Sequence, residues 1–319
     1  MRERAGAIEA GAANLQAMGF MALAALGVAL ITLLVRLAAA DGLHPFVVAF
    51  FRNVVGLVFL MAIVRRVGER SLRTERLPLH ALRGVLQTFA MLGWFYGLTL
   101  TSMATVAALG FTAPLFATLL AILILREPVG WRRWAGLLVG FAGTLVILRP
   151  GAEAVSTGAV LVVASAFCWG SVMIVLRFLG RTETSLTSTV YAGFFLVPFT
   201  FVPALLVWRW PSPGELVVLV AIGVVASGVQ LCVAEAFKRG ETAAVLPVDF
   251  TKLIWGALLG LVVFAEVPDL ATLAGGTLIF AAVVYVAYRE RAVGTARAAP
   301  NVRPRSEERR VGKECATGC

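Results

Sequence analysis

The stretch that decides the fold is residues 104–136, ATVAALGFTAPLFATLLAILILREPVGWRRWAG, because the chain contains it twice. Shifted forward by 139 positions without a gap, it falls on residues 243–275, AAVLPVDFTKLIWGALLGLVVFAEVPDLATLAG. The copies are identical at nine of 33 positions: Ala104/Ala243, Val106/Val245, Phe111/Phe250, Thr112/Thr251, Leu119/Leu258, Leu120/Leu259, Glu127/Glu266, Ala135/Ala274 and Gly136/Gly275. We therefore interpret the chain as two related halves.

The two copies differ in the charges that follow their shared glutamate. After Glu127 the first copy carries Arg132 and Arg133, whereas after Glu266 the second has no lysine or arginine before Arg289. Because cationic loops stay in the cytoplasm, one connection should lie inside the cell and its counterpart outside. Repeats that cross a bilayer in opposite directions are typical of secondary transporters.

The composition is that of a membrane protein. Mean hydropathy is +0.89, and 60% of the 319 residues are hydrophobic against 14% charged, as expected for several helices of about 20 apolar residues each. The net charge of +10 lies at the ends of apolar segments rather than on one basic surface. It therefore indicates membrane topology and argues against nucleic-acid binding. Four scattered cysteines do not make a disulfide framework.

Ten apolar segments are long enough to span a bilayer. They cover residues 18–39, 45–64, 79–98, 102–125, 131–148, 157–178, 186–207, 216–236, 242–264 and 270–288. If residues 1–17 are cytoplasmic, the cations collect in the even-numbered connections, and the odd-numbered ones carry almost none. The chain is then predicted to lie in the inner membrane with both termini on the cytoplasmic side.

The predicted fold class is thus an all-α, polytopic membrane protein. A first five-helix repeat is expected at residues 18–150 and a second at 151–290. The first span is too long for the apolar part of a signal peptide, so it should be retained as a helix. Residues 291–319 are polar, and we expect a disordered cytoplasmic tail there; its run RSEERRVGKEC resembles appended rather than native sequence.

Residues 101–151 resemble the signature of the EamA family in the drug/metabolite transporter superfamily. The residues that carry the resemblance are Ala104, Ala113-Pro114-Leu115, Arg126-Glu127-Pro128, and the segment from Gly136 through Gly143 to Arg149-Pro150. The second half repeats the pattern more loosely. The resemblance implies ten helices in two inverted five-helix repeats around a central cavity, lined by the third, fourth, eighth and ninth helices with the first and sixth. It also implies transport of small organic metabolites in either direction.

Each copy of the repeat contains a glutamate followed closely by proline, at Glu127-Pro128 and at Glu266 two residues before Pro268. Proline lacks an N–H and is tolerated only in the first turn of a helix. A glutamate beside it meets the positive helix N-terminus, worth roughly 0.3–1 kcal/mol. We therefore interpret Glu127, Pro128 and Glu266 as structural helix corners, with transport chemistry as the alternative.

Prolines also interrupt two corresponding spans. Pro114 removes a helical hydrogen bond to Gly110, and Pro247 removes one to Ala243. Interrupted helices at matching places in two halves indicate a transport site, so Gly110, Pro114 and Pro247 are predicted to lie at the substrate-binding site. A packing kink without a ligand is the alternative.

The ninth span carries two charges that its counterpart lacks. Asp249 and Lys252 fall roughly 10–15 Å into the membrane, counted from the start of the span, and their spacing of three lets them pair. Ionisable residues at such depth are expensive and commonly functional. The equivalent residues in the first half are Gly110 and Ala113. We therefore predict that Lys252 meets an anionic group of the substrate, while Asp249 holds Lys252 or binds a cation or proton.

Four further charged residues are candidates for gating or coupling: Arg36, Arg52, Arg83 and Glu235. For Arg36 and Arg52, near outer ends of spans, snorkelling to the interface explains the charge equally well.

Aromatic side chains offer a second kind of substrate contact. Trp169, near the middle of its span, could stack on a planar substrate or belong to the core. Trp94 and Tyr96 could also stack on such a substrate, but we expect them to be belt residues at the membrane interface.

No phosphate-binding G-x-x-x-x-G-K-[ST] motif and no metal-binding H-E-x-x-H motif occur in the sequence, so we expect no cofactor, no metal site and no enzyme activity. The favoured function is a secondary transporter that exports amino acids or related metabolites by alternating access. Uptake of a vitamin or nucleoside-like metabolite is the alternative, and a non-transport scaffold or receptor is the rival of a different class. The expected partners are a small-molecule substrate and the lipid bilayer. The sequence leaves open whether transport is coupled to protons or to exchange of a second compound. It also leaves the oligomeric state open, and a monomer is compatible with it.

Overall fold

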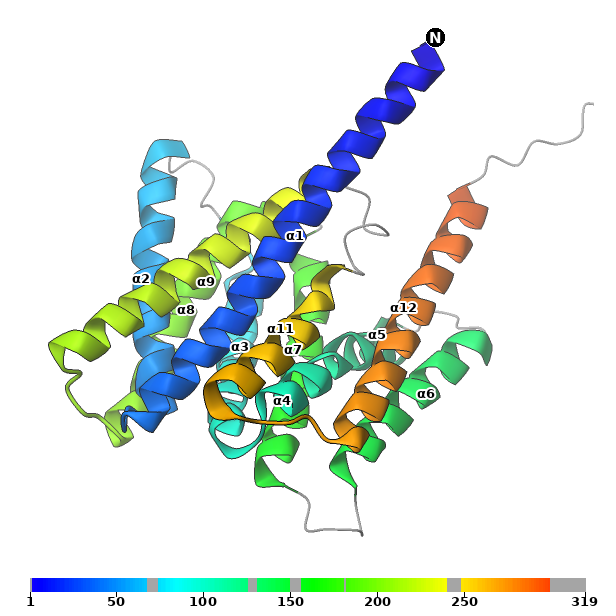
Figure 1. Cartoon of the computed structure of the whole chain (residues 1–319). Helices are drawn as coiled ribbons and strands as arrows, with labels where there is room; N and C mark the ends of the chain where they lie inside the picture. The colour runs from blue at the N-terminus through cyan, green and yellow to red at the C-terminus, as the bar shows by residue number, and fades with distance from the viewer. Residues whose placement is uncertain are drawn as a thin grey trace, which may run out of the picture.

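The computed structural model describes residues 2–67, 74–125, 131–149, 156–180, 182–239 and 248–298, and all regular structure in these ranges is helical (Figure 1). The helices are α1 (Arg2–Ala40), α2 (Pro45–Val67), α3 (Leu77–Leu100), α4 (Met103–Gly110), α5 (Thr112–Leu125), α6 (Trp131–Leu148), α7 (Thr157–Leu179), α8 (Ser185–Leu206), α9 (Pro213–Arg239), α11 (Thr251–Phe264) and α12 (Leu270–Ala298). The prediction of an all-α, polytopic fold is confirmed.

The helices present a surface that suits lipid rather than water. Six described stretches are long and apolar enough to cross a membrane: residues 13–40, 45–62, 103–124, 157–179, 187–206 and 213–233. Three shorter apolar helices cover residues 134–148, 251–264 and 270–286. Large apolar side chains point outward, with Leu206 84% and Val262 72% exposed. A soluble protein rarely exposes so much contiguous apolar surface, so the bilayer covers these faces.

The packing of the helices repeats when the two halves are exchanged. α3 packs along α7 as α9 packs along α1, α5 contacts α7 as α11 contacts α1, and α3 contacts α8 as α9 contacts α2. The pairs α2 with α8 and α6 with α12 correspond to themselves under this exchange. The helix contacts therefore have the twofold pattern that the sequence repeat predicts.

Glycine allows one of these self-corresponding pairs to approach closely. A Cβ atom on Gly143 of α6 would lie 2.7 Å from the carbonyl oxygen of Gly275 in α12, and one on Gly275 would lie 2.5 Å from the carbonyl oxygen of Gly143. Small residues at helix contacts are the usual way for membrane helices to pack closely.

The fourth span is broken where the repeat places Phe111. α4 ends at Gly110, and α5 begins at Thr112 after the single turn residue Phe111, whose N–H donates to the carbonyl of Ala108 at 3.2 Å. The hydroxyl of Thr112 donates to the carbonyl of Leu109 at 2.6 Å. Pro114 has no N–H to offer Gly110. The hydroxyl of Thr112 thus satisfies one of the backbone carbonyls beside the break.

The ninth span is interrupted in the same way, with a threonine hydroxyl bonded at the break. A short helical turn at Val248 and Asp249 ends at Phe250, and α11 starts at Thr251. The hydroxyl of Thr251 donates to the carbonyl of Val248 at 2.8 Å, which is the bond made by Thr112 in the first half. Pro247, predicted to cause this break, lies outside the described residues.

Both ends of the chain are more helical than the sequence boundaries suggest. α1 begins at Arg2 rather than near residue 18, and α12 continues to Ala298, past the expected start of a disordered tail at 291. These extensions are rich in alanine, arginine and glutamate, which are strong helix formers. Residues 299–319 lie outside the described ranges.

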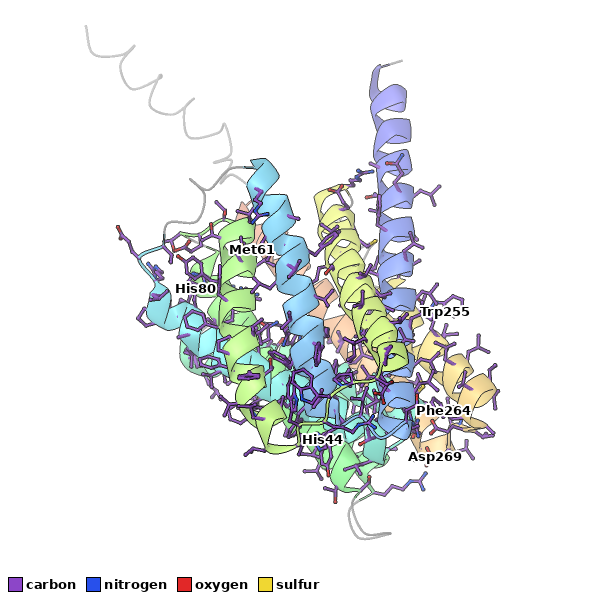
Figure 2. The ribbon with its side chains drawn as sticks, turned by 90° about the vertical axis from the view of Figure 1, so that its left-hand side faces the viewer. His44, Met61, His80, Trp255, Phe264 and Asp269 are labelled. Atoms are coloured by element: carbon purple, nitrogen blue, oxygen red, sulfur yellow. The ribbon has the colours of Figure 1, made fainter. Side chains whose placement is uncertain are left out.

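The connections between helices sort into two groups. The odd-numbered ones contact one another: Arg209 donates to the carbonyl of Asp41 at 3.5 Å, and Arg149 pairs with Asp269. Figure 2 shows His44, Phe264 and Asp269 together at the end opposite the N-terminal part of α1. Two even-numbered connections are joined elsewhere by Thr74 and Glu183, 2.6 Å apart.

Candidate substrate-binding site

A cavity of about 400 Å³ lies between the two halves, which is within the usual range for small-molecule sites, about 300–1,000 Å³. Its wall comes from α1, α2, α3, α4, α5, α7, α9 and α11. These helices belong to the first, third, fourth, sixth, eighth and ninth spans, as the family resemblance implies, with α2 in addition. The polar and charged side chains of the wall are Thr32, Arg52, Gln87, Ser165, Gln230 and Lys252.

The two helix breaks meet beside this cavity. The rings of Phe111 and Phe250, which occupy equivalent positions, stack with centroids 4.1 Å apart and planes 14° from parallel. Phe280 from α12 packs against Phe250 in a T-shaped contact, also with centroids 4.1 Å apart. The equivalence of the halves is therefore visible as a direct contact at the centre of the molecule.

Gly110, at the end of α4, lines the cavity and makes room for an indole. A Cβ atom there would lie 2.6 Å from both Cη2 and Cζ3 of Trp94, closer than side-chain packing allows. Trp94 and Trp169 both belong to the cavity wall. The expectation that Trp94 is an interfacial belt residue is wrong, because α3 turns this side chain inward. Tyr96, 38% exposed, instead stacks near His44 with centroids 5.7 Å apart.

Lys252 and Asp249 form an ion pair, with Nζ 2.6 Å from Oδ2. The ammonium also lies 4.3 Å from the centroid of the Phe111 ring, a favourable cation–π distance. Of the two residues, Lys252 belongs to the cavity wall and Asp249 does not. The structure therefore brings the two charges together at the break of the second half, where the first half has Gly110 and Ala113, both also in the wall.

Arg52 of α2 reaches the cavity wall instead of the lipid interface. Its Nη1 donates to Oδ1 of Asn53 at 3.1 Å and lies 3.6 Å from Sδ of Met91. Its Nε is buried and has no partner. Asn53 in turn donates to Oγ1 of Thr200 in α8 at 3.3 Å, so neighbouring helices hold this region of α2 in place.

Sequence reasoning missed the two glutamines of the wall, Gln87 and Gln230. Gln87 is 7% exposed, and its Oε1 has no hydrogen-bond partner. A buried amide without a partner is unfavourable, which marks Gln87 as a candidate ligand contact. The available signal was an uncharged polar residue in the middle of an apolar span.

Arg36 lies near the end of α1 and is not part of the cavity wall. It forms an ion pair with Glu266, and its guanidinium lies 4.5 Å from the centroid of the Phe264 ring. The other carboxylate oxygen of Glu266 accepts from the backbone N–H of Met103 at 3.0 Å. Glu266 thus joins α1, the start of α4 and the end of α11. Its counterpart Glu127 and the adjacent Pro128 lie outside the described residues.

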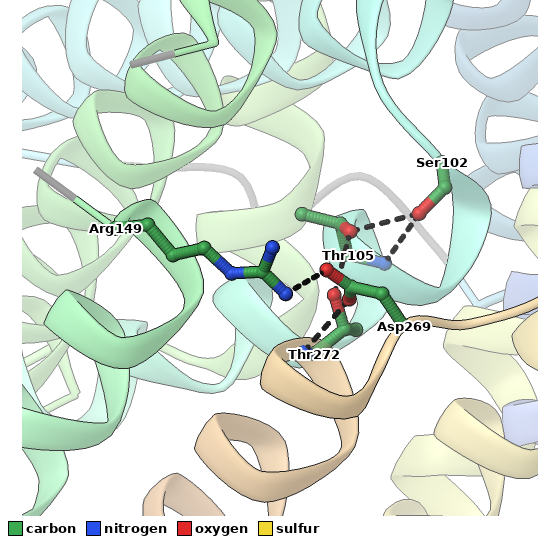
Figure 3. A network of polar contacts seen from close by, with 5 residues as sticks. All are labelled: Ser102, Thr105, Arg149, Asp269 and Thr272. Carbon is green, nitrogen blue, oxygen red and sulfur yellow. Dashed lines mark hydrogen bonds and ion pairs between the residues drawn. The ribbon is translucent and has the colours of Figure 1, made fainter. Parts of the chain in front are cut away.

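A second polar network lies at the same end (Figure 3). Arg149 pairs with Asp269, which also accepts from the backbone N–H of Thr272 at 2.9 Å. Thr105 connects Thr272 and Ser102 through hydroxyl contacts of 3.2 and 2.8 Å. Hydrogen bonds from Thr272, together with the charge of Arg149, hold the pKa of Asp269 below its usual value. These bonds tie the starts of α4 and α12 to the end of α6.

The remaining predicted residues lie away from the cavity wall. Nη1 of Arg83 contacts both the carbonyl and the hydroxyl of Ser188 in α8 at 2.6 Å. Glu235 pairs with Arg239 one turn later in α9, at 2.8 Å. Pro114 lies within α5 but is not in the wall. Among the residues that the structure describes, no three His, Cys, Asp or Glu side chains gather as a metal site would require.

Comparison with known families decides what this arrangement is. The sequence matches the EamA-like transporter family twice, over residues 15–149 and 156–288. The chain belongs to the EamA-like transporter family. It is therefore a multi-pass membrane protein that transports small molecules, and not an enzyme.

Three curated relatives show the range of this family. The chain is 30% identical over 249 residues to an S-adenosylmethionine uptake transporter of Rickettsia prowazekii, covering 78% of this chain and 85% of the relative. It is 31% identical over 277 residues to a riboflavin transporter of Vibrio cholerae, covering 85% and 93%. It is 28% identical over 242 residues to a pseudopaline exporter of Pseudomonas aeruginosa, covering 74% and 84%.

The fold also occurs in a solved structure. A crystal structure superposes with a TM-score of 0.58 at 22% sequence identity, and the match covers 89% of this chain and 99% of that one. At this identity the similarity concerns the fold alone.

Proposed function

We propose that this chain is a secondary transporter that takes up a vitamin- or nucleoside-like metabolite by alternating access of the central cavity. The observation that carries the proposal is the presence of Trp94 and Trp169 in a cavity lined by both broken spans. Indole faces bind planar rings by stacking, while the interrupted helices provide the polar contacts that fix a substrate within a membrane.

The relatives support a planar substrate. S-adenosylmethionine contains an adenine ring and riboflavin a flat tricyclic ring, and proteins named for transport of these compounds are 30% and 31% identical to this chain. Stacking of a ring on one of these tryptophans is a contact that both compounds could make, although they differ elsewhere.

Export of amino acids is the second candidate. It is favoured by the Lys252–Asp249 pair, which presents a cation and an anion 2.6 Å apart beside the cavity, because a zwitterion carries the complementary charges. The pseudopaline exporter shows that relatives include a protein named for export.

We further propose that residues 18–150 and 151–290 form two inverted repeats. The protein would lie in the inner membrane with both termini in the cytoplasm. The Arg36–Glu266 pair then closes the outer end and must open when substrate passes. Asp249 is the candidate for proton coupling, and exchange is the alternative. Glu127 and Pro128 are proposed as the inner helix corner that corresponds to Glu266.

Transport into proteoliposomes tests this function. The purified protein should accumulate labelled riboflavin or S-adenosylmethionine in preference to labelled leucine or glutamate. Replacing Trp169 with Ala should raise KM about two- to tenfold, because ring stacking contributes about 0.5–1.5 kcal/mol. The matched control is Trp134→Ala, since Trp134 is 42% exposed on α6 outside the cavity wall. Transport of leucine or glutamate alone would favour the amino-acid carrier.

Topology is tested separately with single cysteines placed just after Leu125 and just after Phe264. A membrane-impermeant maleimide applied to intact cells should label the second site and not the first. Labelling of both sites from one side would contradict the inverted arrangement.

A further inference from the structure

The cavity wall contains two cations that are treated very differently by the protein. Lys252 is neutralised by Asp249, 2.6 Å away. Arg52 has only uncharged neighbours, Asn53 and Met91, and its buried Nε has no partner. Within the described part of the chain, no carboxylate pairs with Arg52.

This makes Arg52 unusual among the arginines that the structure describes. Four others pair with carboxylates: Arg36 with Glu266, Arg149 with Asp269, Arg209 with Glu215 and Arg239 with Glu235. Arg83 also lacks a carboxylate and also has a buried Nε without a partner, but Ser188 offers its Nη1 two oxygens at 2.6 Å, and Arg83 is not part of the cavity wall. A guanidinium stays protonated, and a charge inside a membrane is costly unless it is paired or lines a water-filled cavity. The cavity with Arg52, Lys252 and Asp249 therefore has one positive charge without its counterion.

The neighbours of Arg52 hold it in position for a ligand. Asn53 accepts from Arg52 and donates to Thr200, whose hydroxyl in turn contacts the carbonyl of Leu196 at 2.6 Å. Gln87 lines the same cavity with an unpartnered acceptor oxygen. The site thus lacks an acceptor for the guanidinium and a donor for the Gln87 amide oxygen.

We infer that Arg52 and Gln87 form a carboxylate subsite of the transport cavity, so that the substrate joins a planar ring to a carboxylate with an N–H or O–H group near it. The inference rests on the proposed function and assigns the substrate anion to Arg52 rather than to Lys252, which Asp249 already satisfies. A guanidinium binds a carboxylate through two parallel hydrogen bonds. The carboxylate would also give Arg52 the counterion that the protein itself does not supply.

Matched ligands that differ in the carboxylate test the subsite. The probes are S-adenosylmethionine against its decarboxylated form, tryptophan against tryptophanamide, and riboflavin as a planar compound without a carboxylate. Binding is measured calorimetrically to the full chain in lipid nanodiscs. We expect the acid of at least one pair to bind at least tenfold more tightly than its partner, as about 1.4 kcal/mol or more of charge-assisted bonding would give.

Two substitutions should remove this preference. Arg52→Gln deletes the cation, and Asn53→Asp places an internal carboxylate where Oδ1 of Asn53 already accepts from Arg52 at 3.1 Å. In both variants the acid and its partner should bind within about threefold of each other. Asn53→Asp should also raise the unfolding temperature of the ligand-free protein, which gives a readout if Arg52→Gln does not fold. The matched control is Arg65→Gln, an exposed arginine on the same helix.

The outcomes separate the two levels of the proposal. Equal binding of both members of each pair to the wild-type protein, or a preference that survives in both variants, overturns the carboxylate subsite. Tight binding of riboflavin without any preference for acids leaves the proposed function standing and removes only the subsite. Absence of binding and of transport for every probe would reject the proposed function as well.

Discussion

The two helix breaks at the centre of the protein share a backbone and differ in chemistry. At each break a threonine hydroxyl donates to a carbonyl three residues earlier, Thr112 to Leu109 and Thr251 to Val248. The preceding phenylalanines stack on each other at 4.1 Å. Around this common frame the first half has small, uncharged residues, and the second has the Asp249–Lys252 pair.

The difference shows which features belong to the architecture and which to the substrate. A fold of two inverted halves needs both helices interrupted at matching depth, so the hydroxyl bond and the ring occur twice. A metabolite has no twofold symmetry, so the groups that contact it need not be duplicated. Gly110 gives space to Trp94, whereas its equivalent Asp249 holds a cation. We infer that symmetry builds the cavity and that departures from symmetry give it specificity.

The largest effect is expected from removing the charges that only the second break carries. Lys252→Met leaves Asp249 without its cation and should lower the free energy of unfolding by about 2 kcal/mol, less than the 3–5 kcal/mol of a fully buried pair, because the two side chains are only partly buried. The double variant Asp249→Asn/Lys252→Met should recover this stability, since no charge is left unpaired. Neither variant should transport. Unfolding in detergent and proteoliposome transport measure the two effects; a double variant that transports at the normal rate would contradict the comparison.

The next test fills the space that the first break leaves open. Gly110→Ala places a Cβ atom 2.6 Å from the Trp94 ring and should displace the indole. Overpacking of this kind costs about 1–3 kcal/mol, so substrate binding should weaken about tenfold or more. Gly228→Ala in α9 is the control, because nothing lies within 4 Å of its added Cβ atom. Equal effects of the two substitutions would show that Gly110 is not specifically required.

A smaller effect is expected from the contact that joins the breaks. In a double-mutant cycle of Phe111→Leu and Phe250→Leu, the coupling should be about 0.5–1.5 kcal/mol, as for other aromatic pairs. Phe195→Leu and Phe111→Leu should be additive, because Phe195 stacks on Phe199 in α8 instead. Chemical unfolding monitored by fluorescence gives the values. Additivity of Phe111→Leu and Phe250→Leu would mean that the rings contribute independently.

The smallest expected quantity is the difference between the two threonines in what each contributes to stability. Thr112→Val and Thr251→Val each remove one hydrogen bond and should lower the free energy of unfolding by about 1 kcal/mol. If the breaks are equivalent, the two losses should agree within about 0.5 kcal/mol. Thr277→Val in α12 serves as a reference, since its exposed hydroxyl bonds only within its own helix. A large loss at one break and none at the other would show that the symmetry does not extend to energetics.

Local and repeated features of the chain were open to prediction from the sequence. The interruption near Pro114 follows from a missing N–H, and the pairing of Asp249 with Lys252 follows from a spacing of three within one helix. The grouping of odd-numbered connections at one end follows from counting spans. Such features depend on neighbours in the sequence or on the bilayer, and both are known before folding.

The rotation of each helix about its axis was not open to prediction. In lipid an outward face is as apolar as an inward one, so α3 gives no pattern that turns Trp94 and Gln87 toward the cavity, and the inward placement of Arg52 on α2 could not be distinguished from snorkelling. The partner of Arg36 is Glu266, 230 positions away and in the other half of the chain. The sequence alone determined the repeat, the spans and the places where helices break, because these are set by local chemistry. Only the tertiary structure decided which side chains share the cavity, because close packing between helices fixes their orientation where hydrophobicity does not.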